Sequence, residues 1–357
     1  MNFLEIIAEN RTKINKIDEK ILELIKEREI LSSKIGEAKR FLSLSDKDNK
    51  REKEVFLSAI NKAQALELPV RLITALQQIL MDISLIRQEK DRIKQTQNKS
   101  LTILIIGGAG RMGAWLSDFF SNSSHKVSIF DKTIPSNLQK ALKNQDLVVL
   151  ATPIGATKEI LLELPRYLNK KTIIFDISSV KNLLKDSLED LKNQGFLVTS
   201  LHPMFGPSIE YLFGKHIIRT SLGVSIADDL AASLFKNTSL TLVDMSFEEH
   251  DKIISYLLSL SHLINLVFVE SLRHSPYAAS FLSNFSSTTF HNQLSIAKKV
   301  FDENPHLYFE IQKLNPYSEK IYEALEQALK TITSFVKNNQ KDLFVSMMKQ
   351  NQDFLLK

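Results

Sequence analysis

A glycine-rich turn near residue 110 has the residue types needed to hold a dinucleotide. The apolar run 101–106 leads into the segment Gly107-Gly108-Ala109-Gly110-Arg111-Met112-Gly113. Its glycines match the spacing G-x-G-x-x-G, in which successive glycines permit a tight turn, admit a pyrophosphate to the backbone and let helix pack on strand. Backbone N–H groups at the start of the helix then bind the phosphates. We expect cofactor contacts from Gly108, Gly110, Arg111, Met112 and Gly113.

An acidic residue after the next predicted strand indicates which nicotinamide cofactor fits. The run 127–130 (Val-Ser-Ile-Phe) ends at Asp131, close to the distance at which such folds place an acid on the ribose 2′-hydroxyl. A carboxylate there repels the 2′-phosphate of NADP, so the sequence predicts NAD. The alternative is a glycine turn beside an aspartate that only faces solvent.

Side chains suited to proton chemistry follow two later strands and open a helical region. The segments are 176–182 (Asp-Ile-Ser-Ser-Val-Lys-Asn), 201–207 (Leu-His-Pro-Met-Phe-Gly-Pro) and 249–251 (Glu-His-Asp). Ligands of open α/β sheets bind beyond the carboxyl ends of strands, where the first two segments lie. A neutral imidazole can accept a hydrogen bond from a hydroxyl there, so we predict that His202 is catalytic, assisted by Ser179 and Lys181. His250 and His262 either line a pocket or pack as ordinary helix histidines, and His202 itself could be a structural residue before a turn.

A third group of polar residues lies within the first 90 positions. Arg28 and Lys39 are 11 positions apart, about 1100° of helical rotation, so they share a face to within roughly 20°. Asp48 and Glu52 are one helical turn apart, as are the serine and the amide at positions 84 and 88. For each residue alone, a solvated helix surface is the simpler interpretation. The members of the group are Arg28, Lys39, Asp48, Arg51, Glu52, Ser84 and Gln88.

Long helices must position this third group. Residues 3–41 contain no proline and repeat apolar residues at helical spacing, which predicts one helix of roughly 38 residues and about 57 Å. The polar run 43–50 breaks the pattern, a second helix ends before Pro69, and Pro69 suits the first turn of a third helix. Three helices of which one is so long cannot close a core alone, because much of the long helix lacks a partner. We therefore expect an intertwined helical dimer.

The middle of the chain alternates between apolar runs and helical stretches, which predicts a doubly wound α/β domain. The runs are 101–106, 126–130, 147–151, 172–175 and 196–199. After about residue 244 the pattern is helical as far as residue 357, with breaks at Pro276, Pro305 and Pro316. The predicted fold is multidomain. It comprises an all-α domain over 1–95, a Rossmann-type α/β domain over 100–245 and an all-α domain over 246–357.

Composition excludes several classes of protein. The 357 residues are 43% hydrophobic and 24% charged and lack cysteine, which excludes disulfides, thiolate metal sites and cysteine nucleophiles. The net charge of +5 is mild and the N-terminal third alternates its signs, so we expect no nucleic-acid partner. Residues 253–272 are the most apolar stretch, but they contain His262, Asn265 and Glu270, which favours a buried helix over a membrane span. Because the N-terminus does not resemble a signal peptide, we expect a cytoplasmic protein, and we predict no metal site.

The helical group resembles the active site of the small all-helical chorismate mutases over residues 5–90. The matching positions are Arg11, Arg28, Ile35-Gly36-Glu37-Ala38-Lys39, Asp48, Arg51, Glu52, Ser84 and Gln88. The resemblance implies rearrangement of chorismate to prephenate between the helices of an intertwined dimer, with Arg11 supplied by the other subunit. Arg11 lies about 260° around the helix from Arg28, so the two cannot easily face one pocket.

The resemblance also implies a role for each polar residue. Chorismate rearranges without covalent help, so the protein supplies a compact conformation and stabilises charge on the breaking ether oxygen. Lys39 and Gln88 would donate hydrogen bonds to this oxygen, and the amide of Gln88 needs no protonation to do so at neutral pH. The substrate carboxylates would be held by Arg11, Arg28 and Arg51, and the ring hydroxyl would be bound by Asp48 and Glu52, with Ser84 in the same pocket.

The segments 176–182, 201–207 and 249–251 resemble prephenate dehydrogenases, and the similarity extends over residues 100–350. It implies hydride transfer from the hydroxyl-bearing ring carbon of prephenate to NAD, with loss of the ring carboxylate as carbon dioxide. Among the histidines of the helical region, His250 is our candidate for contact with the substrate. A mutase followed by a dehydrogenase joins consecutive reactions, because the product of one is the substrate of the other. The sequence thus predicts a bifunctional homodimer of tyrosine biosynthesis that acts on chorismate and prephenate.

One position departs from the dehydrogenase pattern. That family usually places an arginine just before an apolar-rich stretch ending in Asp-Pro, where it binds the carboxylate of prephenate; here Lys299 holds this place, and the stretch 286–291 also differs. Lysine keeps the charge but loses the bidentate fork. Three alternatives stay open: an enzyme pair for the 4-amino-4-deoxy analogues, a dehydrogenase whose helical module only dimerises or senses an effector, and a general reductase of small hydroxy acids.

Overall fold

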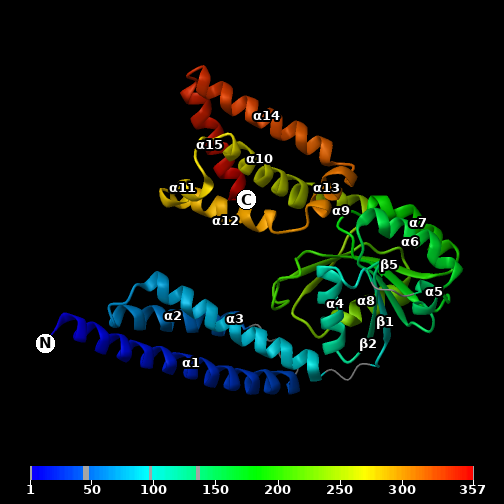
Figure 1. Ribbon diagram of the computed structural model, residues 1–357, viewed down its shortest axis with the longest axis horizontal. Helices are drawn as coiled ribbons and strands as arrows, with labels where there is room; N and C mark the ends of the chain where they lie inside the picture. The colour runs from blue at the N-terminus through cyan, green and yellow to red at the C-terminus, as the bar shows by residue number, and fades with distance from the viewer. Residues whose placement is uncertain (1, 43–47, 96–98, 134–136, 357) are drawn as a thin grey trace.

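The chain folds into a central mixed α/β region with helical regions before and after it (Figure 1). The computed structural model describes residues 2–42, 48–95, 99–133 and 137–356, and the side chains of 49, 94 and 95 are not described. Parts of two predicted connections, at 43–50 and 95–100, fall outside these residues. The predicted fold class, an all-α domain, a Rossmann-type domain and a second all-α domain, is confirmed.

Three helices form the N-terminal region, and the predicted long helix is present. They are α1 (Phe3–Phe41), α2 (Asn49–Ala65) and α3 (Val70–Gln95). A capping box begins α1, in which the Asn2 side chain accepts from the Leu4 N–H and Glu5 reaches back to the Asn2 N–H. Pro69 precedes α3 instead of occupying its first turn, and its carbonyl accepts from the N–H groups of Leu72 and Ile73. The helix α3 packs against both α1 and α2.

A seven-stranded sheet forms the centre of the molecule. Its strands are β1 (Thr102–Ile106), β2 (Lys126–Phe130), β3 (Leu147–Leu150), β4 (Ile173–Asp176), β5 (Leu197–Pro203), β6 (His216–Arg219) and β7 (Thr241–Asp244). They run in the order β2-β1-β3-β4-β5-β6-β7, and all neighbours are parallel except β5 and β6. The chain reverses its direction of winding between β1 and β3, and open α/β sheets bind ligands at such a point.

Helices cover both faces of the sheet, so the inner strands β1, β3, β4 and β5 are buried. On one face lie α4 (Arg111–Asn122) and α8 (Ser225–Phe235), packed on Ile103, Val149 and Phe175. On the other face, Leu104, Val148 and their neighbours contact the remaining elements. These are α5 (Leu138–Ala141), α6 (Ile154–Glu163), the 3-10 helix η1 (Leu164–Arg166) and α7 (Asn182–Asn193). This burial explains the continuous apolar runs that mark the strands in the sequence.

The C-terminal region is helical. Its elements are α9 (Phe247–Ile254), the π-helical turn η2 (Ser255–Leu260), α10 (Ser261–Arg273), α11 (Ala279–Asn284), α12 (Thr288–Phe301), α13 (Pro305–Leu314), α14 (Ser318–Lys337) and α15 (Lys341–Leu355). Pro305 occupies the first turn of α13, and Pro276 and Pro316 lie between helices, so the predicted breaks are confirmed. The turn η2 follows α9 and contacts α13 and α14. These contacts hold α9 against the rest of the region.

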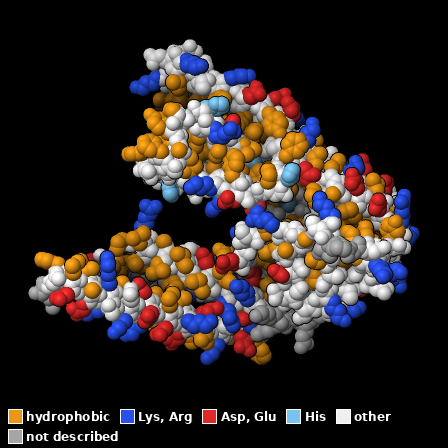
Figure 2. Space-filling model, in the orientation of Figure 1, with side chains coloured by type: hydrophobic (Ala, Val, Ile, Leu, Met, Phe, Trp, Pro, Cys, Tyr) orange, Lys and Arg blue, Asp and Glu red, His pale blue; other side chains and the backbone are white. Residues whose placement is uncertain are grey.

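The continuous segment Phe247–Arg273 corrects one prediction. Within the described residues it is long and apolar enough to cross a membrane by length and composition alone. Only 22% of its most apolar window is buried in the chain, so the prediction of a buried helix is wrong for a single subunit. Its exposed residues include Tyr256, Leu257, Ile264 and Val267. Figure 2 shows hydrophobic side chains gathered on both helical regions. A surface of this kind marks a protein interface or a membrane contact.

Candidate active sites

The glycine turn between β1 and α4 is shaped for close approach of a ligand to the backbone. Gly107 has φ +85°, and a Cβ atom there would lie 2.5 Å from the carbonyl oxygen of Ala151. A Cβ on Gly113 would lie 2.2 Å from the carbonyl oxygen of Gly107, so only glycine allows α4 to pack this closely. Gly110 caps α4, whose first residues are Arg111 and Met112. The G-x-G-x-x-G spacing predicts the tight turn at Gly108. The positive φ instead lies one residue earlier, at Gly107.

Asp131 lies directly against this turn. It follows β2, and its Oδ2 accepts a hydrogen bond of 3.3 Å from the N–H of Ala109. Its Oδ1 accepts from the hydroxyl of Thr133 at 3.0 Å, which fixes the carboxylate at the edge of the turn. A bare glycine cradle with an acid at its rim fits the pyrophosphate and ribose of NAD. Arg111 is turned toward Glu303 beyond the end of α12, at 2.8 Å.

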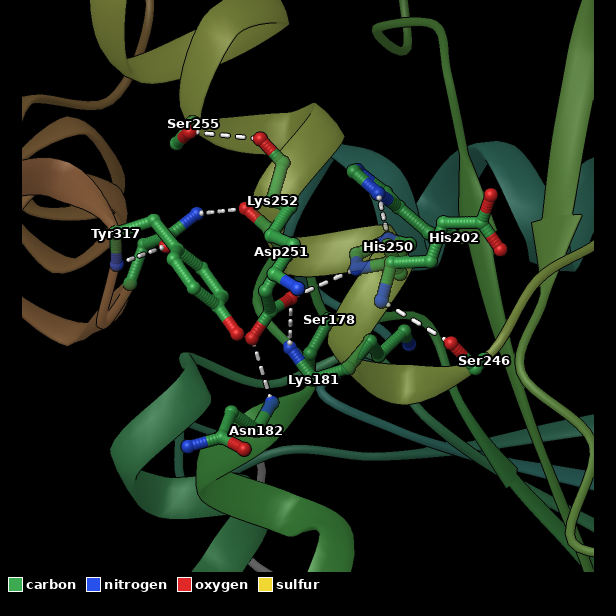
Figure 3. Close-up of polar contacts among 12 residues, drawn as sticks. Ser178, Lys181, Asn182, His202, Ser246, His250, Asp251, Lys252, Ser255 and Tyr317 are labelled. Carbon is green, nitrogen blue, oxygen red and sulfur yellow. Dashed lines mark hydrogen bonds and ion pairs between the residues drawn. The ribbon is translucent and has the colours of Figure 1, made fainter. Parts of the chain in front are cut away.

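A chain of buried hydrogen bonds runs from β5 to the start of α7 (Figure 3). His202, near the end of β5, contacts His250 of α9 through Nδ1 and Nε2 at 2.9 Å. His250 Nδ1 lies 2.7 Å from Asp251 Oδ1. The same carboxylate accepts from the backbone N–H groups of Lys181 at 2.9 Å and Asn182 at 2.7 Å, at the N-terminus of α7. This series of hydrogen bonds therefore links β5, α9 and the start of α7 around the imidazole of His250.

The direction of these bonds determines the tautomer of His202. A carboxylate only accepts, so His250 Nδ1 carries the hydrogen and donates to Asp251. In the neutral ring, His250 Nε2 is then an acceptor, and His202 Nδ1 must donate to it. This leaves a lone pair on His202 Nε2, which suits a group that accepts a hydrogen bond from a substrate hydroxyl.

Burial keeps both imidazoles neutral. Desolvation lowers the pKa of His202 well below 6.5, and the nearby His250 and Lys181 lower it further. Desolvation also lowers the pKa of His250, although Asp251 opposes this shift. His250 is 0% exposed in this structure, and His202 is 3% exposed. His262 packs on Tyr308 with ring centroids 4.1 Å apart, and burial lowers its pKa to about 4.

Lys181, which was expected to assist His202 at the site, is buried inside the fold. Its side chain is 0% exposed, and its Nζ donates to Asp176 Oδ2 at 2.7 Å and to the carbonyl of Leu201 at 2.6 Å. Burial lowers the pKa of Lys181, and Asp176 opposes that shift. The ammonium thus ties the end of β4 to the residue before His202. Ser179 is half-buried and follows β4.

Lys299 lies on the helix that borders the dinucleotide turn. It is exposed on α12, four positions before Glu303, which lies beyond the end of the helix. Glu303 pairs with Arg111, and its Oε1 would lie 3.6 Å from a Cβ on Gly206. The end of this helix therefore contacts both the cofactor turn and the segment that follows His202. No hydrogen bond or ion pair of Lys299 is found among the described residues.

In the N-terminal region, α1 and α3 bring part of the third polar group together. Arg28 donates to the hydroxyl of Ser84 and to the carbonyl of Leu80. One turn further along both helices, the Gln88 amide donates to the Ser32 hydroxyl at 2.8 Å and to the Ser32 carbonyl at 3.0 Å. A Cβ on Gly36 would lie 2.8 Å from Gln88 Cγ, so the predicted Ile-Gly-Glu-Ala-Lys segment has its glycine where the helices are closest.

The other members of the group lie apart from this wall or have local partners. Arg11 is exposed on α1, 17 positions and roughly 26 Å along the helix from Arg28, so one chain does not bring them together. Asp48 caps α2 by accepting from the Arg51 N–H at 3.0 Å, and the Arg51 guanidinium pairs with Glu54 at 3.2 Å. Half-buried Lys39 and Glu52 lie at the end of α1 and the start of α2.

Several residues at the sites escaped the sequence analysis. Asp251 was quoted only as part of a motif, although it orients His250. Glu89 follows Gln88 and is 2% exposed, and a buried carboxylate in a polar stretch gives no pattern to detect. Glu310 accepts from the N–H of Ile154 at 2.9 Å at the start of α6, beside the winding reversal. Only Gly107 had a usable signal, because it begins a glycine doublet.

The chain matches three known families in succession. Residues 10–89 match the family described as chorismate mutase type II. Residues 116–218 match the nucleotide-binding domain of prephenate dehydrogenase, and residues 246–350 match its dimerization domain. The crystal structure of a prephenate dehydrogenase from Aquifex aeolicus, in complex with hydroxyphenyl propionate and NAD+, superposes with a TM-score of 0.59 at 20% identity. It covers 73% of this chain and 99% of that one.

Relatives match both parts of the chain. The chorismate mutase of Methanocaldococcus jannaschii is 33% identical over 97 residues, which are 27% of this chain and 97% of that protein. A probable arogenate/prephenate dehydrogenase of the same organism is 27% identical, over 71% of this chain and 61% of its own length. The T-protein of Haemophilus influenzae is 23% identical over 99% of this chain and 93% of its own length. The chain belongs to the bifunctional family in which a type II chorismate mutase precedes a prephenate dehydrogenase.

Proposed function

We propose that His202 is the catalytic hydrogen-bond acceptor of the dehydrogenase reaction, in which prephenate becomes 4-hydroxyphenylpyruvate and carbon dioxide. NAD held at the glycine turn would supply the acceptor for the hydride that leaves the ring carbon bearing the hydroxyl. The lone pair on His202 Nε2 accepts the hydroxyl proton as that carbon becomes carbonyl-like. His250 and Asp251 hold the ring in the required tautomer, and Ser179 contacts the substrate nearby. The single observation that carries this assignment is the direction of that hydrogen-bond chain.

Further residues would bind NAD and a carboxylate of prephenate. Gly108, Gly110, Met112 and Gly113 shape the turn for the pyrophosphate, and Asp131 accepts from the ribose hydroxyls. Arg111 would leave Glu303 to meet a phosphate. Lys299 would provide the cation for a carboxylate of prephenate, because α12 borders both the cofactor turn and the segment after His202. We place the domain boundaries at 1–95, 100–245 and 246–357.

For the mutase reaction we propose a pocket on the α1–α3 wall. Arg28, held by Ser84, would bind a carboxylate of chorismate, and the Gln88 amide with Lys39 would donate to the breaking ether oxygen. Glu52 and Asp48 at the start of α2 would accept from the ring hydroxyl, and Arg51 would bind the second carboxylate. Arg11 would come from the partner subunit, since it lies far along α1 from this wall. The chain acts as a homodimer, in keeping with its dimerization domain.

We propose that the enzyme acts in the cytoplasm, on the route from chorismate to tyrosine. One observation favours a second candidate substrate pair. Lys299 offers a point charge and not the bidentate fork of an arginine, which leaves room for the 4-amino-4-deoxy analogues of chorismate and prephenate. Both candidates use the same residues, so only the substituent at the ring carbon distinguishes them.

Steady-state assays on purified protein decide between the candidates. NADH formation is followed at 340 nm with prephenate, with its 4-amino-4-deoxy analogue and with NAD or NADP. Chorismate consumption is followed separately without nucleotide. We expect turnover of chorismate and prephenate, preference for NAD, and a kcat/KM for the amino analogue at least tenfold lower, about 1.4 kcal/mol of discrimination. Preference for the amino analogue would replace the first candidate with the second, and loss of chorismate turnover would reduce the helical module to a dimerising role.

A further inference from the structure

Glu89 lies buried where the helical and α/β regions meet. It belongs to α3 and is 2% exposed. One carboxylate oxygen accepts the backbone N–H of Leu212 at 2.6 Å, and the other accepts the backbone N–H of Ser239 at 2.8 Å. Leu212 lies between β5 and β6, and Ser239 lies just before β7. A single side chain of the mutase region thus binds two separate segments of the dehydrogenase region.

The surrounding contacts make this a docked interface. Arg92, one turn beyond Gln88, donates to the hydroxyl of Ser239 at 2.6 Å. Ile93, one turn beyond Glu89, packs against the hydrophobic cluster on the α4–α8 face of the sheet, to which Leu212 belongs. Figure 1 shows the end of α3 against the α/β region while its start lies far from it. The last turns of α3 therefore pack against the core of the dehydrogenase region.

Gln88 and Glu89 are consecutive residues of α3 that face different parts of the molecule. Consecutive residues on a helix differ by about 100° in direction. Gln88 faces α1, where its amide contacts Ser32, and Glu89 faces the α/β region. A movement of the helix that changes one of these contacts must change the other, because the backbone between them is a single rigid turn.

Glu89 also holds the far end of the segment that begins at His202. Residues 203–212 run from the end of β5 to Leu212, and Phe205 and Ile209 pack against the same cluster. Gly206, within this segment, approaches Glu303 on the cofactor side. The segment is thus fixed at one end by the strand of His202 and at the other end by the Glu89 carboxylate.

We propose that Glu89 is a positioning residue shared by the two active sites. It sets the segment 203–212 against the prephenate pocket and sets α3 so that Gln88 meets the ether oxygen of chorismate. The inference rests on the proposed function, because it uses the sites assigned there. It adds a residue that contacts neither substrate and acts on both reactions.

The test is a variant of Glu89 that keeps the shape of the side chain but leaves only one oxygen to accept a hydrogen bond. In Glu89→Gln, one carboxylate oxygen becomes an NH2 group that faces a backbone N–H donor, so one of the two bonds is lost. We expect the KM for prephenate to rise about fivefold or more and the kcat for chorismate to fall about tenfold, as small misplacements of reacting groups do. Ser239→Ala is the matched control, because it removes the Arg92 contact and leaves the Glu89 bonds; we expect both reactions within twofold of the wild type.

The comparison separates positioning from loss of folded protein. Partial unfolding would lower both kcat values by one common factor and leave both KM values unchanged, and that outcome overturns the proposal. Unchanged constants in a folded Glu89→Gln dimer also overturn it. If this variant does not fold, Glu89→Asp, which keeps the charge but is one methylene shorter, is judged by the same criteria. The wild type is assayed first, so absence of either activity there counts against the proposed function and not against the role of Glu89.

Discussion

The α/β region and the N-terminal helices bury their residues in opposite ways. In the α/β region, strand residues such as Ile103 and Val149 are fully enclosed by helices of the same chain. In the helical region the enclosed side chains are largely polar, among them Ser32, Ser84 and Gln88. The apolar residues of α1 that repeat at helical spacing stay exposed, and they include Ile14, Ile17, Leu24 and Leu31.

This difference shows which site one chain can complete. The hydrogen-bonded series His202, His250 and Asp251 is assembled from β5 and α9 of one subunit, and the start of α7 binds Asp251. The mutase wall has Arg28 and Gln88 but lacks Arg11, and the exposed apolar face of α1 has no partner within the described part of the chain. Burying that face against a second chain would stabilise the helices and deliver the missing cation.

The largest expected effect is loss of the dehydrogenase activity with the mutase activity unchanged. His202→Ala deletes the acceptor for the substrate hydroxyl, and we expect kcat for prephenate oxidation to fall by about a thousandfold. Chorismate turnover by the same protein serves as the internal control and should stay within twofold. Retention of more than a tenth of the oxidation rate would remove His202 from the catalytic role.

The next effect tests the shared mutase site. Arg11→Ala and Arg28→Ala should each lower mutase kcat/KM by about a hundredfold, because each removes a contact with a substrate carboxylate. When the two variants are unfolded and refolded together in equal amounts, half of the dimers contain one chain of each variant. Each such dimer has one intact site of two, so activity should recover to roughly a quarter of the wild type. Refolding each variant alone is the control. Absence of recovery would mean that both arginines serve the same subunit's pocket.

A smaller effect concerns the choice of cofactor. Asp131→Ala removes the carboxylate at the rim of the glycine turn, and we expect KM for NAD to rise about tenfold while KM for NADP falls. Mutase activity again controls for folding. Asp131→Glu keeps the charge and should preserve the preference for NAD. An unchanged NAD/NADP ratio in the alanine variant would leave Asp131 as a solvent-facing residue of the turn.

The histidines predict how stability depends on pH. The pKa values of His202, His250 and His262 are lowered in the folded protein, that of His262 to about 4, so below pH 6.5 the unfolded chain binds protons that the folded chain does not. The free energy of unfolding should therefore be at its full value above pH 6.5 and fall as the pH drops toward 4, which urea titrations measure. His262→Gln should flatten the curve, and an equally steep curve would show that His262 does not contribute.

The smallest expected effect is at Lys299. Lys299→Arg restores a bidentate fork at the position where α12 borders the pocket, and we expect KM for prephenate to fall about threefold with kcat unchanged. The neighbouring Lys298→Arg is the matched control and should have no effect. A rise in KM for prephenate together with a fall for its amino analogue would instead indicate that lysine is adapted to the second substrate pair.

The sequence was sufficient for the parts of the fold that repeat a period. The long α1, the buried strands and the helical C-terminal region were predictable because burial imposes spacing on apolar residues. Contacts that depend on three-dimensional neighbours were not. Lys181 and His250 have residue types typical of catalysis, yet both side chains are fully buried in the fold, which their spacing in the sequence does not reveal. Glu89 gave no signal, since its partners are backbone N–H groups more than a hundred positions away.

The central claim is that one chain holds two separate pockets that share an intermediate, and mixing two variants tests it most directly. Gln88→Ala, which lacks the ether-oxygen donor, and His202→Ala are each supplied with chorismate and NAD, alone and as an equal mixture, and 4-hydroxyphenylpyruvate is measured. We predict little product from either variant alone and restored formation in the mixture, because prephenate released by His202→Ala is oxidised by Gln88→Ala. A mixture as inactive as its components, or one variant that loses both reactions, would contradict the account.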